Sequence, residues 1–314
     1  MPIRHVALTY ACNRNCTYCY ANALAKKFPD MNLENFKKVI KWFDEQNIHQ
    51  FSLIGGEPTI HKEFKKIIKI LKEKNFKAGL LTNLIFDPNR IDEFDSDVIM
   101  SYFINYSQPT EYLPKQKEIL ENNLKNIRRI TSKITLRINF PSNQTHFKYL
   151  IDACIRHDIN SVSYAITAPS IGKTNVFTKI NEFQKMSGTI LNFIQACKEQ
   201  GIKPILARPI PFCLFTKEER KFIKINSTSK GVCGIGSNVY LINPDLSVFP
   251  CVGLHVAEAR KLKITEIKSE REIFRFYQPL VKRLKWKTFI YPKCPSCKFS
   301  IRKQCQGVCL AYKY

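Results

Sequence analysis

Strand-like and helix-like segments alternate along the first two hundred residues, and this alternation constrains the fold more than any other feature. In residues 62–77, for example, lysines cover one face of a predicted helix, and the other face is apolar: Phe64, Ile67, Ile68 and Leu71. Six or seven such strand–helix units in succession predict an α/β fold with a parallel sheet and helices outside it. The sheet is either an open doubly wound sheet or a curved partial barrel.

The pattern changes after residue 210. Residues 238–242 and 247–249 predict a short hairpin around an Asn-Pro-Asp turn, and the remaining segment is rich in cysteine. We therefore expect a catalytic domain of residues 1–210 and a small cysteine-rich domain of residues 211–314.

Cysteine use indicates metal or redox chemistry. The chain has 12 cysteines in 314 residues, and its first residues do not resemble a signal peptide. Disulfides are uncommon in proteins that are not exported, so metal binding is the better interpretation. No run of about 18 apolar residues suggests a membrane span. We therefore expect a soluble cytoplasmic protein.

The formal net charge of +24 attracts anionic partners. Nucleic acid is one such partner, but no basic run is interleaved with aromatic residues as nucleic-acid-binding segments often are. An acidic peptide or a carrier protein fits the charge better. The same lysines also serve as the solvated faces of amphipathic helices, so the charge alone does not identify the partner.

Three cysteines, Cys12, Cys16 and Cys19, lie on one short loop after the first predicted strand. Three thiolates match three irons of a [4Fe–4S] cluster and leave the fourth iron open for a substrate or cofactor. A zinc site would need a fourth ligand nearby, and His5, inside the strand, is the one local candidate. Gly55-Gly56-Glu57 follows the second strand, at the edge of a parallel sheet where ligands bind.

The loop Cys12-Asn-Arg-Asn-Cys16-Thr-Tyr18-Cys19 resembles the Cys-x3-Cys-x-aromatic-Cys motif of the radical S-adenosylmethionine (SAM) superfamily. The resemblance implies a partial (β/α)6 TIM barrel whose cluster binds the amino and carboxylate groups of SAM at its open iron. It also implies that one electron from the reduced cluster cleaves SAM to a 5′-deoxyadenosyl radical, which abstracts a hydrogen atom from a substrate.

The same resemblance assigns SAM contacts. Gly55-Gly56-Glu57 is similar to the motif that holds the amino group of SAM, since glycine permits close approach and a carboxylate pairs with an ammonium. Thr82-Asn83-Leu84 is similar to a Thr-Asn-Gly motif, with leucine in place of glycine. The cofactor-binding candidates are the Tyr18 backbone facing adenine, Gly55, Gly56, Glu57, Asn83, and Arg137 and Asn139 for ribose or carboxylate.

A second cysteine group occupies the C-terminal segment: Cys233, Cys251, Cys294, Cys297, Cys305 and Cys309. The last four have spacings that a zinc ribbon would also accept. Because they follow a radical SAM-like motif in the sequence, they resemble the SPASM or twitch extension, which carries auxiliary iron–sulfur clusters. The chain departs from that pattern in three ways. The gap between Cys297 and Cys305 is seven residues rather than five, Leu246 replaces a usual glycine, and no cysteine follows Cys309.

Cys213 brings the number of candidate auxiliary ligands to seven, enough for one cluster with four thiolates and another with three. The family's interleaving assigns Cys213, Cys233, Cys251 and Cys309 to the first cluster. Cys294, Cys297 and Cys305 would then hold a second cluster with an open iron. The alternative is a single full cluster built from the last four cysteines.

Cys154 and Cys197 lie on apolar faces of predicted helices, which is typical of buried structural cysteine. The alternative role is donation of a hydrogen atom to a substrate radical. Acidic residues beyond Glu57 form no pair suited to acid–base catalysis, so the catalytic residues remain unassigned.

These features predict a radical SAM enzyme that modifies a ribosomally made peptide or a protein side chain. The rival enzyme is a radical SAM dehydrogenase of a small molecule such as an aminosugar alcohol, and the non-enzymatic rival is a zinc or iron–sulfur binding module. Expected partners are an acidic peptide and an electron donor such as flavodoxin or ferredoxin. Because few residues precede Cys12, we expect any domain that recognises a leader peptide to be on another chain.

Overall fold

The computed structural model describes residues 3–228, 232–235, 239–254 and 262–314. Its strands form one sheet in the order β10-β9-β8-β1-β2-β3-β4-β5-β6-β7. The strands are β1 (Ile3–Thr9), β2 (Gln50–Gly55), β3 (Lys77–Thr82), β4 (Ile99–Asn105), β5 (Ile134–Phe140), β6 (Ser161–Ile166), β7 (Lys203–Leu206), β8 (Val239–Ile242), β9 (Ser247–Phe249) and β10 (Leu262–Lys263). Strands β1 to β7 run parallel in sequence order. β7 and β10 form the two edges, so the barrel is open, as expected.

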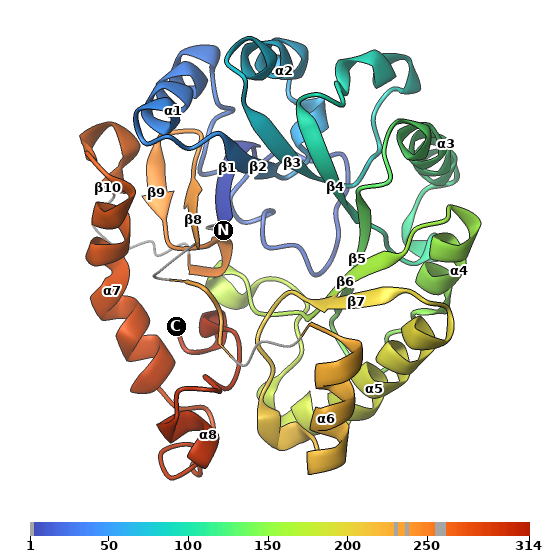
Figure 1. Ribbon diagram of the computed structural model, residues 1–314, viewed down its shortest axis with the longest axis vertical. Helices are drawn as coiled ribbons and strands as arrows, with labels where there is room; N and C mark the ends of the chain where they lie inside the picture. The colour runs from blue at the N-terminus through green and yellow to red at the C-terminus, as the bar shows by residue number, and fades with distance from the viewer. Residues whose placement is uncertain (1–2, 229–231, 236–238, 255–261) are drawn as a thin grey trace.

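Helices cover the outside of the curved sheet (Figure 1). Those beside the sheet are α1 (Leu33–Glu45), α2 (Phe64–Glu73), α3 (Pro114–Ile130), α4 (Lys148–Arg156), α5 (Phe183–Glu199) and α7 (Glu270–Trp286). Two further helices lie away from the strands (Figure 1): α6 (Lys217–Asn226) beside α5, and α8 (Lys298–Ile301) in the C-terminal segment. The apolar face of α2 is buried through Phe64, Ile67, Ile68 and Leu71, as its periodicity predicts. The prediction of a partial barrel is confirmed.

The C-terminal hairpin joins the barrel sheet. β8 pairs with β1 in parallel and with β9 in antiparallel orientation. At the hairpin turn, Asn243 is fully buried and accepts a hydrogen bond from Tyr10 Oη at 2.6 Å. The hairpin itself was expected, and its pairing with β1 was not. The division into domains at residue 210 stays a prediction, since the two segments share one sheet.

Cys154 of α4 and Cys197 of α5 lie in the hydrophobic core, with 1% and 0% of their surface exposed. Burial raises the pKa of each thiol to about 12. Both positions match the expectation of structural cysteines.

None of the helices in the part of the chain that the structure describes is both long enough and apolar enough to cross a bilayer.

Candidate functional site

The cysteine loop starts at the carboxyl end of β1 and is fastened to the end of β2. The backbone N–H of Gly56 donates to Thr9 O at 2.8 Å, and that of Glu57 donates to Ala11 O at 2.9 Å. Thr9 Oγ1 in turn accepts from the N–H of Ala11 at 2.9 Å. These bonds position the residue immediately before Cys12, so the Gly-Gly-Glu segment places the cysteine loop.

Both glycines are required by this close approach. A Cβ atom at Gly55 would lie 1.9 Å from Thr9 O, and one at Gly56 would lie 2.2 Å from Ala11 O. Gly55 also has a φ of 154°, which side chains disfavour. In this structure the two glycines therefore serve the packing of β2 against the loop, whatever contact they also make with a cofactor.

Glu57 links the ends of β2 and β3. Its carboxylate is fully buried and accepts hydrogen bonds from Thr59 N, Thr59 Oγ1, Thr82 Oγ1 and Asn83 N at 3.1, 2.8, 2.7 and 2.6 Å. Burial raises its pKa, and these four hydrogen bonds oppose that rise. Both carboxylate oxygens are bonded within the chain, so contact of Glu57 with the amino group of SAM stays a prediction.

Asn83 lies against the cysteine loop. Its Nδ2 donates to Asn13 Oδ1 at 2.8 Å and to Cys12 Sγ at 3.6 Å. The next residue, Leu84, has a φ of 61° and is fully buried. The leucine that replaces the family's glycine thus keeps the left-handed backbone conformation that glycine adopts more readily.

The three thiols of the loop are partly exposed, and two of them receive backbone N–H donors. Arg14 N donates to Cys12 Sγ at 3.4 Å, and Ala21 N donates to Cys19 Sγ at 3.3 Å. Such N–H···S bonds stabilise the thiolate ligands of iron–sulfur clusters and tune their potential.

Burial raises the pKa of the Cys12 thiol to about 11 and also raises that of Cys16, so ligation by iron would have to displace the protons. Across the described residues, no three Cys, His, Asp or Glu side chains are close enough to hold a single metal ion. The donor set itself, three thiols on one loop with N–H donors to sulfur, fits a [4Fe–4S] cluster.

Tyr18 connects the loop to β4 and β5. Its hydroxyl lies 2.7 Å from Ser107 Oγ and accepts from Asn105 Nδ2 at 2.9 Å. Asn105 Oδ1 accepts from Asn139 Nδ2 at 3.4 Å, so Asn139 belongs to the same polar group. The backbone carbonyl of Tyr18 accepts from Asn175 Nδ2 at 3.0 Å. Its contact with adenine stays a prediction.

Sequence reasoning missed three of the residues that hold the cysteine loop: Asn105, Asn175 and Arg14. The guanidinium of Arg14 lies 4.0 Å from the centre of the Tyr112 ring and donates to Ser107 Oγ at 3.2 Å. Asn105 ends β4 just as Asn83 follows β3, so both lie at the carboxyl ends of strands, where ligands bind. Asn175 and Arg14 have no comparable signal, since their partners are distant in sequence.

Arg137 of β5 contributes to a positive region with Arg208, which follows β7. Burial and the nearby charge of Arg208 lower the pKa of Arg137. Burial and Arg137 together lower the pKa of His5 to about 4, so His5 is neutral at pH 7. Within the described residues neither arginine forms an ion pair with a carboxylate. Two unpaired guanidinium groups in a partly buried setting favour the binding of an anion.

Cys233, Cys251 and Cys309 form one group in the C-terminal segment. Burial and the nearby thiols of Cys309 and Cys233 raise the pKa of Cys251. The backbone of Gly253 and Leu254 opposes that rise, and the N–H of Leu254 donates to Cys251 O at 3.1 Å.

Lys285 of α7 supports the same group, because its Nζ donates at 2.8 Å to the carbonyl oxygens of both Cys233 and Ile235. The structure thus brings together Cys233, Cys251 and Cys309, the three cysteines that the expected interleaving assigned to one cluster.

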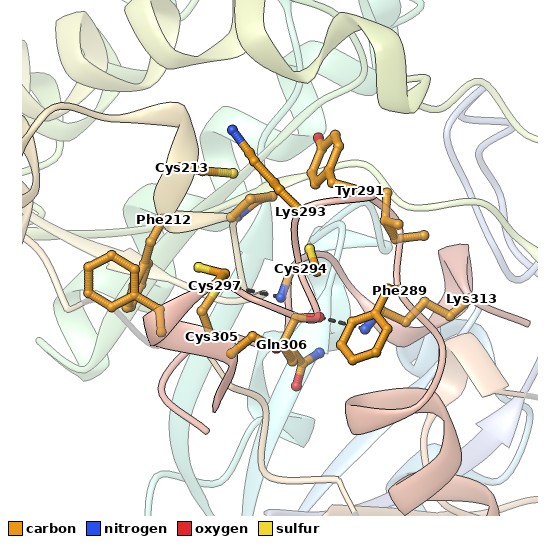
Figure 2. A pocket seen from close by; sticks show the side chains of 15 residues that line it. Phe212, Cys213, Phe289, Tyr291, Lys293, Cys294, Cys297, Cys305, Gln306 and Lys313 are labelled. Carbon is orange, nitrogen blue, oxygen red and sulfur yellow. Dashed lines mark hydrogen bonds between the residues drawn. The ribbon is translucent and has the colours of Figure 1, made fainter. Parts of the chain in front are cut away.

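Cys213 lies elsewhere. It lines one pocket together with Cys294, Cys297 and Cys305, and Figure 2 shows these four side chains around the same space. The expected interleaving assigned Cys213 to the group of Cys233, so the structure differs from it at this residue. The physical reason is the course of the chain after β7, which passes beside Phe299 rather than beside Cys251.

Comparison with known protein families agrees with this geometry. Residues 6–99 match the family described as "Radical SAM superfamily", and this range includes the cysteine loop, Gly55-Gly56-Glu57 and Asn83. The N-terminal part of the chain is therefore similar to the radical SAM superfamily. The expected enzyme class is therefore confirmed at the level of the superfamily.

Relatives match about a third of this chain. A "Putative glycyl-radical enzyme activating enzyme" of Methanocaldococcus jannaschii is 29% identical over 106 residues, which are 32% of this chain and 41% of the relative. A "7-carboxy-7-deazaguanine synthase" of the same organism is 30% identical over 136 residues, which are 38% of this chain and 54% of the relative. The matches thus span about half the length of these relatives or less.

Solved structures match the fold of nearly the whole chain. SuiB of Streptococcus suis bound to S-adenosylmethionine has a TM-score of 0.71 at 16% identity, covering 99% of this chain and 74% of that one. SuiB bound to the precursor peptide SuiA has the same TM-score and identity and covers 99% and 72%. The enzyme anSMEcpe with bound AdoMet and Cp18Cys peptide has a TM-score of 0.69 at 18% identity, covering 98% and 89%. These likenesses show a shared fold that extends through the cysteine-rich segment.

Proposed function

We propose that this protein is a radical SAM enzyme that modifies a peptide or protein side chain. The observation that carries the proposal is the arrangement of Cys12, Cys16 and Cys19 on a loop at the carboxyl end of β1, held by the Gly-Gly-Glu segment at the end of β2. When bound, a [4Fe–4S] cluster with SAM would supply one electron and a 5′-deoxyadenosyl radical that abstracts a hydrogen atom.

The chain's own residues bind and orient the cofactor. We assign the three loop cysteines to three irons and leave the fourth iron to SAM. The backbone of Gly55, Gly56 and Tyr18 approaches the cofactor, because these positions border the loop. Arg137 provides the positive charge for a carboxylate, and Asn139 extends the polar group of Tyr18 toward a ribose. Glu57 holds the ends of β2 and β3 together.

A peptide substrate is supported by three observations. The fold is shared with SuiB bound to its precursor peptide and with anSMEcpe bound to a peptide. The net charge of +24 attracts acidic partners. Arg137 and Arg208 present unpaired positive charge. A substrate with carboxylate groups would match that charge.

A small-molecule substrate is the second candidate, because the relative named 7-carboxy-7-deazaguanine synthase matches the core at 30% identity. That match covers 38% of the chain, whereas the peptide-bound structures match 98% or more. The cysteine-rich segment, shared with the peptide-bound structures, therefore favours the peptide.

We assign residues 211–314 to an auxiliary domain that holds one or two [4Fe–4S] clusters. Reduction of these clusters and of the first one requires an electron donor such as flavodoxin or ferredoxin, in a cytoplasmic setting. A separate chain would bind a leader peptide if the substrate carries one.

Formation of 5′-deoxyadenosine tests the proposal. The anaerobically reconstituted protein with SAM and dithionite should release 5′-deoxyadenosine, and Cys16→Ala should release none. Cys154→Ala is the matched control, since it removes a core cysteine and should retain activity. Zinc in place of iron in the reconstituted protein, or equal product from Cys16→Ala, would contradict the proposal.

A further inference from the structure

The segment η6 (Phe212–Leu214) brings Cys213 to the second half of the cysteine-rich segment. Cys213 is exposed, and the pocket it lines contains the three cysteines of the Cys-x2-Cys-x7-Cys series (Figure 2). Those three are Cys294, Cys297 and Cys305. Thus four thiols from two distant parts of the chain border one space.

Two contacts hold η6 in this place. The backbone of Phe212 lies close to the Cys305 sulfur and opposes the rise that burial causes in the pKa of that thiol. The Phe212 ring packs edge-on against Phe299, with the ring centres 5.4 Å apart. Arg220 of α6 strengthens the junction, since its guanidinium lies 5.3 Å from the centre of the Phe299 ring and donates to Phe212 O at 3.2 Å. The approach of Cys213 to Cys305 is therefore built by apolar, aromatic and hydrogen-bonded contacts.

Cys213 lies apart from the other auxiliary group. Cys233 and Cys309 are the thiols near Cys251, whereas Cys213 lines the pocket of Cys294, Cys297 and Cys305. The chain has no cysteine after Cys309. The two cysteines outside all groups, Cys154 and Cys197, are buried in the core. A fourth thiolate for the Cys294 group can come from Cys213 alone.

We infer that Cys213 is the fourth ligand of a fully thiolate-ligated cluster with Cys294, Cys297 and Cys305, and that Cys233, Cys251 and Cys309 form a three-thiolate site. The inference rests on the proposed function, because it requires auxiliary iron–sulfur clusters. Complete thiolate ligation leaves no open iron, so the Cys213 cluster transfers electrons and does not bind substrate. The three-thiolate site keeps one iron position for another ligand.

Iron content in two matched backgrounds tests the inference. In Cys233→Ala/Cys251→Ala, which removes the three-thiolate site, adding Cys213→Ala should lower the iron of the reconstituted protein by about four atoms per chain. Alternatively it should convert the cluster to a three-iron form with its own EPR signal. In Cys294→Ala/Cys297→Ala, which removes the other site, adding Cys213→Ala should leave iron and EPR spectrum unchanged.

The reverse pattern would assign Cys213 to the group of Cys233 and overturn the inference. No change in either background would show that Cys213 is not a ligand and would overturn it as well. A failure of the proposed function would give a different result. The reconstituted protein without substitutions would then already lack the iron that Cys16→Ala is expected to remove.

Alkylation of the unsubstituted protein avoids variants that fail to fold. In the reconstituted holoprotein, iodoacetamide should modify Cys213 at least about tenfold more slowly than it does after iron has been removed by a chelator. Cys294, Cys297 and Cys305 should be protected in the same way. Equal modification of Cys213 with and without iron, measured by peptide mass spectrometry, would refute the assignment.

Discussion

Replacing Gly56 with alanine should displace the cysteine loop. The new Cβ would lie 2.2 Å from Ala11 O and 2.6 Å from Tyr10 O. The backbone before Cys12 would have to move by about 1 Å to restore ordinary contact, and forced overpacking of this kind costs about 1–3 kcal/mol. For a chain of this size that cost lowers the melting temperature by about 2–5 °C.

The larger effect of Gly56→Ala should be on the cluster. The bond from Glu57 N to Ala11 O positions the residue next to Cys12, so a shift of about 1 Å there separates Cys12 from its two partners. Reconstituted Gly56→Ala should therefore lose the iron that Cys16→Ala loses. Iron analysis, 5′-deoxyadenosine formation and thermal unfolding measure the three consequences.

Gly188→Ala is the matched control. Gly188 lies on an exposed turn of α5, and a Cβ there would meet no atom within 4 Å. Alanine in a helix should stabilise the protein by about 0.5–1 kcal/mol and leave the iron content unchanged. Retention of full iron and activity by Gly56→Ala would show that the close approach does not hold the loop.

Two further predictions concern stability. Leu84→Ala should destabilise the protein by about 2–5 kcal/mol because Leu84 is fully buried, and Leu84→Gly should be no worse, since a φ of 61° favours glycine. Denaturant unfolding would contradict this if the glycine variant showed its usual deficit of about 1 kcal/mol against alanine. His5 has its pKa lowered to about 4, so the unfolded chain binds more protons between pH 6.5 and 4 and stability falls as the pH drops through that range. When the pH is lowered from 7.5 to 5.5, the free energy of unfolding should fall by about 1 kcal/mol more for the unsubstituted protein than for His5→Gln. Equal falls in the two proteins would refute a neutral His5.

The order of elements was predictable from the sequence, because periodicity is a local property. The apolar face of α2 and the alternation of strands and helices follow from residues three or four apart, which burial then confirms. The cysteine loop was predictable for the same reason, since its three thiols lie within eight residues of one another. Strand ends that meet at one edge of a parallel sheet then brought Gly55 and Asn83 to that loop, as expected.

Tertiary structure alone decided the contacts between distant segments. The local pattern of β8 gives no sign that it pairs with β1, and the spacing of the cysteines does not say that Cys213 lies in one pocket with Cys305. The Glu57 carboxylate accepts hydrogen bonds from Thr59, Thr82 and Asn83. A motif cannot reveal this role, because Thr82 ends β3 and Asn83 follows it, so both are distant from Glu57 in the sequence. In each case the partner is chosen by the global packing of the chain, and the free energy of that choice depends on residues far apart in sequence.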